Sequence, residues 1–100
     1  MIKVNIYGNN DKIELIGHAL FDDYGKDIVC AGVSSVVTTT VNAILTFDEN
    51  YIEYQNIKDK FIIEVNSHNE IVDNLIKNMI DMLEDIEEDY PNNIKIRKEN

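Results

Sequence analysis

DIVCAGVSSVVTTTVNAILTF, residues 27–47, decides the fold, because its composition alone fits either a strand or a helix. Its valines and threonines suit a strand. A run of this length without a turn signal is nevertheless too long for a typical strand, and Asp27 is a good helix N-cap. Apolar or small residues also recur near helical spacing, at Ile28, Ala31, Val33 or Ser34, Val37, Val41 and Leu45. The sequence therefore predicts a helix that begins after Asp27 and ends before the polar residues 48–50.

Two hairpins flank this helix. Ile2, Val4 and Ile6 alternate with polar neighbours, which is typical of a half-buried strand, and residues 8–11 read as a turn. Residues 12–18 complete the first hairpin. Residues 51–55 and 60–66 predict a second one, with residues 56–59 as its turn.

A second helix is predicted over residues 71–89, where acidic residues crowd one side and Pro91 stops the helix. Its apolar stripe comprises Val72, Leu75 or Ile76, Met79, Leu83, Ile86 and Tyr90. Residues 93–97 form the last strand, with Ile94 and Ile96 facing inward.

The resulting order, β-β-α-β-β-α-β, predicts an α+β fold: a mixed sheet of about five strands with two helices packed on one face. A chain of 100 residues has room for one core, so we expect a single domain over residues 1–100.

Charge and composition restrict the partners. The chain carries 19 Asp and Glu against 9 Lys and Arg, a net charge of −10. Such a charge repels phosphates and favours a basic partner, so we expect no direct contact with nucleic acid. One cysteine cannot form an internal disulfide, and the N-terminus lacks an apolar stretch of signal-peptide length. Polar residues interrupt the apolar run 28–47, so we expect no membrane span and a cytoplasmic protein.

The candidate nucleophile is Cys30. With Asp27 as N-cap, Cys30 is the third helical residue, in a first turn whose backbone N–H groups and partial positive charge stabilise a thiolate. The same N–H groups are candidates for an oxyanion hole. The alternative is an inert cysteine, because cysteine is among the most buried residue types.

His18, Asp27 and Ser34 are candidates to support Cys30. His18 ends the strand before the connection to the helix, so it can lie within hydrogen-bond reach of Cys30 and act as general acid and base. Asp27 caps the helix or orients His18, and Ser34 lies one turn after Cys30 on the same face. His68 is the only other soft ligand, and no pair of these residues has zinc-ligand spacing, so we expect neither a metal nor a cofactor.

These residues carry a family resemblance. Gly17-His18-Ala19, a short loop, and then Gly25-x-Asp27-Ile28-Val29-Cys30-Ala31-x-Val33-Ser34 resemble the ribosomal-processing cysteine protease family, Prp, over essentially the whole chain. The resemblance implies a catalytic dyad of Cys30 and His18, with Asp27 and Ser34 in the same motif. It also implies a mobile loop over the site, formed by Leu20, Phe21, Asp22, Asp23, Tyr24 and Gly25.

The resemblance further implies a cysteine endopeptidase that removes the N-terminal extension of a large-subunit ribosomal protein of the L-twenty-seven type during ribosome maturation, and that forms a homodimer. Two departures stand out: residues 20–24 differ from the small residues and single aromatic common in the family, and Gly32 stands where alanine is usual. The alternative function is a non-catalytic module that binds a ribosomal protein or assembly factor through the same fold, with Cys30 inert.

Overall fold

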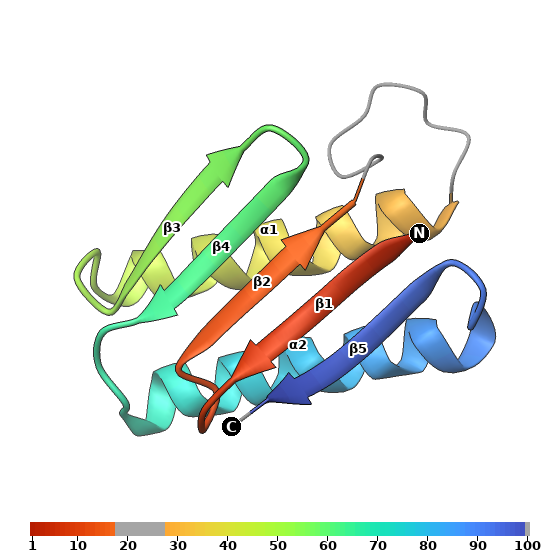
Figure 1. Cartoon of the computed structure of the whole chain (residues 1–100). Coiled ribbons are helices and arrows are strands. Elements are labelled where there is room, and N and C mark those ends of the chain that lie inside the picture. The colour runs from red at the N-terminus through yellow and green to blue at the C-terminus, as the bar shows by residue number, and fades with distance from the viewer. Residues whose placement is uncertain (18–27, 100) are drawn as a thin grey trace.

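The computed structural model describes residues 1–17 and 28–99. Within these residues, five strands and two helices follow one another in the predicted order (Figure 1). They are β1 (Ile2–Tyr7), β2 (Lys12–Ile16), α1 (Ile28–Phe47), β3 (Ile52–Ile57), β4 (Lys60–Val65), α2 (Glu70–Asp89) and β5 (Ile94–Glu99). The α+β class predicted from the sequence is confirmed.

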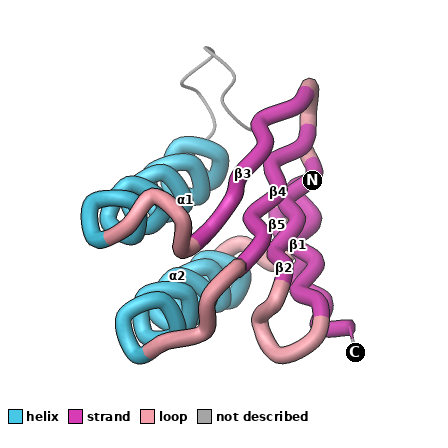
Figure 2. Tube along the Cα trace, turned by 90° about the vertical axis from the view of Figure 1, so that its left-hand side faces the viewer, coloured by secondary structure: helices cyan, strands magenta, loops and turns pink. Residues whose placement is uncertain are grey.

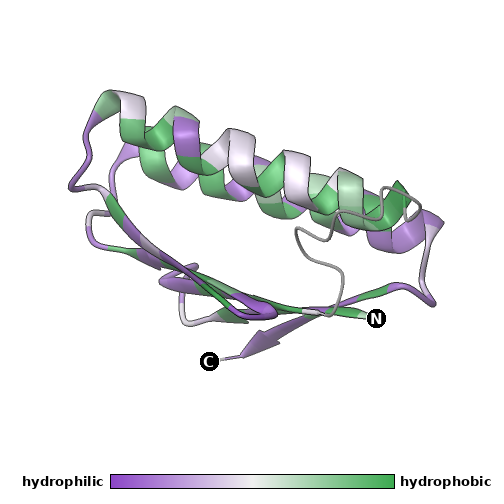
Figure 3. Ribbon diagram, turned by 90° about the horizontal axis from the view of Figure 1, so that it is seen from above, coloured by the Kyte–Doolittle hydropathy of each residue, from purple (hydrophilic) through white to green (hydrophobic). Residues whose placement is uncertain are grey.

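The strands form one mixed sheet in the order β3-β4-β2-β1-β5. Among the described strands, β1 and β5 pair in parallel, and the other three neighbouring pairs are antiparallel. Both helices lie on one face of this sheet (Figures 2 and 3). Neither of the two described helices covers the opposite face, so strand residues alternate between the core and that open face.

Helix α1 forms where composition alone left the choice open. It buries Val33, Val37 and Ile44 against the sheet, and the Thr40 hydroxyl donates to the carbonyl of Val36 at 2.8 Å. By length and composition alone this helix could also cross a membrane. Its buried valines and isoleucine belong instead to the core cluster between sheet and helices, so here α1 is a core helix of the layered fold.

Helix α2 begins after Asn69, whose side-chain oxygen accepts a hydrogen bond from the N–H of Val72 at 3.0 Å. Asparagine is a favoured N-cap because it satisfies one of the first-turn donors. The buried stripe runs through Val72, Ile76, Met79, Ile80 and Leu83. The prediction that Tyr90 closes this stripe is wrong: Tyr90 follows the helix and stays 40% exposed, so Leu83 is the last fully buried position.

Three strand ends differ from the sequence prediction by two residues. One is the end of β5, which lies at Glu99 rather than Arg97. Strand β2 ends at Ile16, two residues earlier than expected. The β3–β4 turn consists of Lys58 and Asp59 alone, because strand pairing extends to Ile57 opposite Lys60. Asp59 has a positive φ of 60°, which Asp tolerates better than most residues, so the turn closes in two residues rather than four.

Candidate active site

Cys30 lies in the first turn of α1, as the sequence predicts. It is the third residue of the helix, and 7% of its surface is exposed. Val33 and Val37 continue the buried face below it. The helix start thus holds the sulfur at the boundary of the core, close to the positive end of the helix dipole, where a thiolate is stabilised.

The start of α1 lies at the end of the sheet where β1 begins and β2 stops (Figures 1 and 3). Gly17 is the last described residue after β2, and its N–H donates to the carbonyl of Asp59 at 3.1 Å. His18, Asp27 and the predicted mobile loop, residues 20–25, lie outside the described residues. The predicted dyad and the role of Asp27 therefore stay predictions.

Ser34 is half-buried and follows Cys30 by one helical turn. Residues four apart on a helix share a face, so the structure places Ser34 on the same side of α1 as Cys30. Its predicted supporting role is untested.

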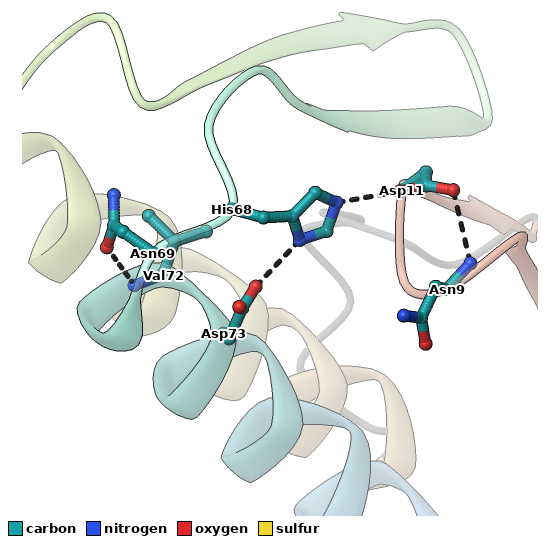
Figure 4. Close-up of polar contacts among 6 residues, drawn as sticks. All are labelled: Asn9, Asp11, His68, Asn69, Val72 and Asp73. Atoms are coloured by element: carbon teal, nitrogen blue, oxygen red, sulfur yellow. Dashed lines mark hydrogen bonds and ion pairs between the residues drawn. The ribbon is translucent and has the colours of Figure 1, made fainter.

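His68 lies far from Cys30, at the opposite end of the sheet. Its Nε2 is 2.7 Å from Asp11 Oδ1 in the β1–β2 turn, and its Nδ1 is 2.7 Å from Asp73 Oδ1 in α2 (Figure 4). The hydrogen bond to Asp73, followed by that to Asp11, raises the pKa of His68 above its usual value. His68 thus links a turn to a helix, and within residues 1–17 and 28–99 no cluster of three or more His, Cys, Asp or Glu is placed to hold a metal ion.

Sequence reasoning missed a buried carboxylate on the open face of the sheet. Glu14, in β2, is only 7% exposed, and its Oε2 lies 2.9 Å from the Lys60 ammonium. Asn5 Nδ2 and the Tyr7 hydroxyl donate to Oε1 at 3.1 and 3.3 Å. The hydrogen bond from Lys60 is the main reason that the pKa of Glu14 is lowered. The signal was a glutamate in a strand with polar, aromatic and basic residues in the neighbouring strands, but the strand order was needed to find it.

Solved structures share this fold closely. A ribosomal processing protease Prp from Staphylococcus aureus, solved with a covalently linked product peptide, superimposes with a TM-score of 0.85 at 32% identity, covering 98% of this chain and 99% of the other. A second structure of the Staphylococcus aureus protease, in complex with a substrate peptide, gives a TM-score of 0.84 at 30% identity with the same coverage.

Sequence comparisons match this chain to proteins of the same name as the structural comparisons do. The ribosomal processing cysteine protease Prp of Staphylococcus aureus is 38% identical over 98 residues, covering 95% of this chain and 92% of the relative. The protein of the same name from Bacillus subtilis is 33% identical over 111 residues, covering 96% of each. These relatives, the fold and the position of Cys30 in the first turn of α1 define the protein as a small α+β cysteine protease. Its residues 1–95 match the family model described as cysteine protease Prp, and the chain belongs to that family.

Proposed function

We propose that this protein removes the N-terminal extension of a large-subunit ribosomal protein of the L-twenty-seven type during ribosome maturation, with Cys30 as nucleophile and His18 as general acid and base. The observation that carries the proposal is the position of Cys30, in the first turn of a core helix, within a chain that matches the family over residues 1–95. Relatives named ribosomal processing proteases support the substrate class.

In the proposed reaction the Cys30 thiolate attacks the scissile carbonyl carbon. The new C–S bond gives a tetrahedral oxyanion, which the positive end of α1 stabilises. His18 donates a proton to the leaving amine as the C–N bond breaks, leaving a thioester. His18 then accepts a proton from the attacking water, and the thioester C–S bond breaks to release the carboxylic acid and restore the thiolate.

The charge of the molecule supports a basic substrate. Helix α2 carries many of the acidic residues of the chain: Glu70, Asp73, Asp81, Glu84, Asp85, Glu87, Glu88 and Asp89. A negative field speeds the approach of a basic protein and disfavours nucleic acid. We include in the proposal a homodimer in the cytoplasm that uses no metal or cofactor and makes no direct contact with nucleic acid or membrane.

The burial of Cys30 is the observation that favours the second candidate, a non-catalytic module that binds a ribosomal protein. A cysteine with 7% of its surface exposed resembles the inert cysteines that are common in protein cores. The two candidates differ in whether the Cys30 sulfur reacts.

The test is cleavage of a synthetic peptide that spans the N-terminal processing site of the organism's own ribosomal protein. We expect wild type to cut it, Cys30→Ala to bind it without cutting, and His18→Ala to be impaired by about 10²-fold or more. Asp27→Asn keeps a good N-cap but removes the charge, so a loss of kcat with unchanged stability assigns Asp27 to His18 rather than to the helix. Cleavage by Cys30→Ala at the wild-type rate would refute the proposed nucleophile.

A further inference from the structure

A pocket of about 300 Å³ lies between α1 and the β3–β4 hairpin. It is lined by Thr38, Val41, Asn42, Tyr54, Asn56 and Phe61. Strand β3 is one of the two edge strands of the described sheet, and it runs beside α1 (Figures 1 and 2). Tyr54 faces the helix layer from this edge strand yet is 51% exposed, so α1 leaves part of the strand uncovered.

The position of the pocket relative to Cys30 follows from helix geometry. Cys30, Ser34 and Thr38 are spaced four residues apart and lie along one side of α1. The α2 side of the helix is different: it carries Gly32, where a Cβ would lie 3.6 Å from Ile86 Cδ1. The face that begins at Cys30 therefore leads along α1 into the pocket.

The distance along α1 from Cys30 to Thr38 corresponds to a few residues of an extended peptide. Eight helical residues separate Cys30 from Thr38, a rise of about 12 Å. An extended chain advances about 3.3 Å per residue, so a peptide running along this face from Cys30 reaches the pocket about four residues from the bond that is cut.

The lining favours an apolar side chain. The Tyr54 and Phe61 rings stack with centroids 5.8 Å apart and an interplanar angle of 18°, and Val41 lies beside them. Thr38, Asn42 and Asn56 add polar but uncharged groups that can hydrogen-bond to a peptide backbone. Every lining residue is uncharged in a chain where 28% of residues are charged, so a charged side chain entering this pocket would find no ion-pair partner in its wall.

We propose that this pocket is a substrate subsite that holds an apolar side chain about four residues from the scissile bond. The proposal rests on the proposed function, since it takes Cys30 as the nucleophile. The occupant is the peptide substrate itself, because the pocket continues the helix face that carries Cys30. The Staphylococcus aureus relative has been solved with a substrate peptide, which shows that a protein of this fold can bind a peptide.

The test uses two neighbouring threonines as a matched pair. Thr38 and Thr39 are both exposed on α1, but Thr38 lines the subsite, whereas Thr39 lies beside Asn78 and Met82 of α2. Thr38→Lys and Thr39→Lys therefore make the same change in helix propensity and net charge. Both are compared with wild type on a set of processing-site peptides in which each residue in turn is replaced by Asp.

We expect wild type to lose roughly 10- to 100-fold in kcat/KM when Asp replaces the residue that enters the subsite. Thr38→Lys should recover cleavage of that peptide alone, and Thr39→Lys should not. Equal position profiles for the two variants would overturn the subsite while leaving the proposed function intact. If wild type cuts none of the peptides, the proposed function fails and the subsite fails with it. The alkylation rate of Cys30 serves as the control, because neither variant should change it.

Discussion

Gly17 lies so close to Ile2 that a Cβ built on the glycine would be 3.1 Å from the Cα of Ile2 and 3.2 Å from its Cγ1. The carbonyl oxygen of Met1 would be 3.3 Å away. The end of β2 thus lies in close contact with the start of β1. At this point Ile2 is 2% exposed, and its backbone N–H donates to the carbonyl oxygen of Asn93 at 2.8 Å. The glycine that precedes the candidate base His18 has a steric reason to be a glycine.

Gly17→Ala tests this contact. Two of the three obstructing atoms, Ile2 Cα and Met1 O, belong to the backbone where β1 begins, and that backbone is held by the sheet. It must shift slightly to admit a methyl group, so we expect the free energy of unfolding to fall by about 1–3 kcal/mol. For a chain of this size each kcal/mol corresponds to roughly 4–8 °C in Tm. We also expect peptide cleavage to fall more than the unfolded fraction explains, since residue 18 follows directly. A Tm equal to or above that of wild type would show that the close approach imposes no constraint.

Gly32→Ala makes the same change as Gly17→Ala, but here we expect stability to increase. The new methyl group would lie in ordinary contact with Ile86 Cδ1, at 3.6 Å, on the α2 side of the helix. Alanine lowers the conformational entropy cost of the helix, so we expect a gain of about 0.5–1 kcal/mol in the free energy of unfolding, measured by urea titration. Cleavage should stay at the wild-type level. A loss of stability would mean that α1 and α2 pack more tightly around Gly32 than the structure shows.

Glu14→Gln tests the buried carboxylate. The amide keeps the shape but presents a weaker partner to the Lys60 ammonium, so we expect a loss of about 1–3 kcal/mol near neutral pH. The pKa of Glu14 is lowered in the folded protein, chiefly by Lys60, so its contribution is present above the unfolded value of about 4.5 and is lost as pH falls through the folded pKa. The difference in urea midpoint between wild type and Glu14→Gln should therefore be larger at pH 7 than at pH 3. Equal midpoints at pH 7 would contradict this role.

The contribution of His68 to stability depends on pH in the opposite direction to that of Glu14. Its pKa is raised by Asp73 and then by Asp11, so its contribution to stability is present below the unfolded value of about 6.5 and is lost as pH rises through the folded pKa. Wild type should exceed His68→Asn in stability at pH 5.5 more than at pH 9. An NMR titration of His68 checks the cause directly: Asp73→Asn should lower the pKa. A His68 pKa unchanged by Asp73→Asn would show that this contact does not persist in solution.

The local elements could be predicted from sequence because their signals are local. The stop before Pro91 and the helical spacing within residues 27–47 depend on near neighbours in the chain. The same holds for the placement of Cys30 in a first turn. The two-residue β3–β4 turn was missed because a positive φ at Asp59 is a weak signal without glycine.

Features that depend on contacts between distant parts of the chain could be found only from the structure. The parallel pairing of β1 with β5 joins the two ends of the chain, and nothing in either strand alone specifies it. The burial of Glu14 depends on β1 and β4 flanking β2, and the pocket beside Tyr54 depends on β3 being an edge strand. The steric role of Gly17 likewise depends on the approach of Ile2.

The central claim is that Cys30 is an activated nucleophile at the start of α1. The most direct measurement is the rate of Cys30 alkylation by iodoacetamide against pH, followed by intact mass on the folded protein and on His18→Ala. We predict a midpoint well below the ordinary thiol value of about 8.5 in wild type, and a higher midpoint in His18→Ala. Alkylation that proceeds only at the rate of unfolding, with the same midpoint in both proteins, would contradict the claim and favour an inert, buried cysteine.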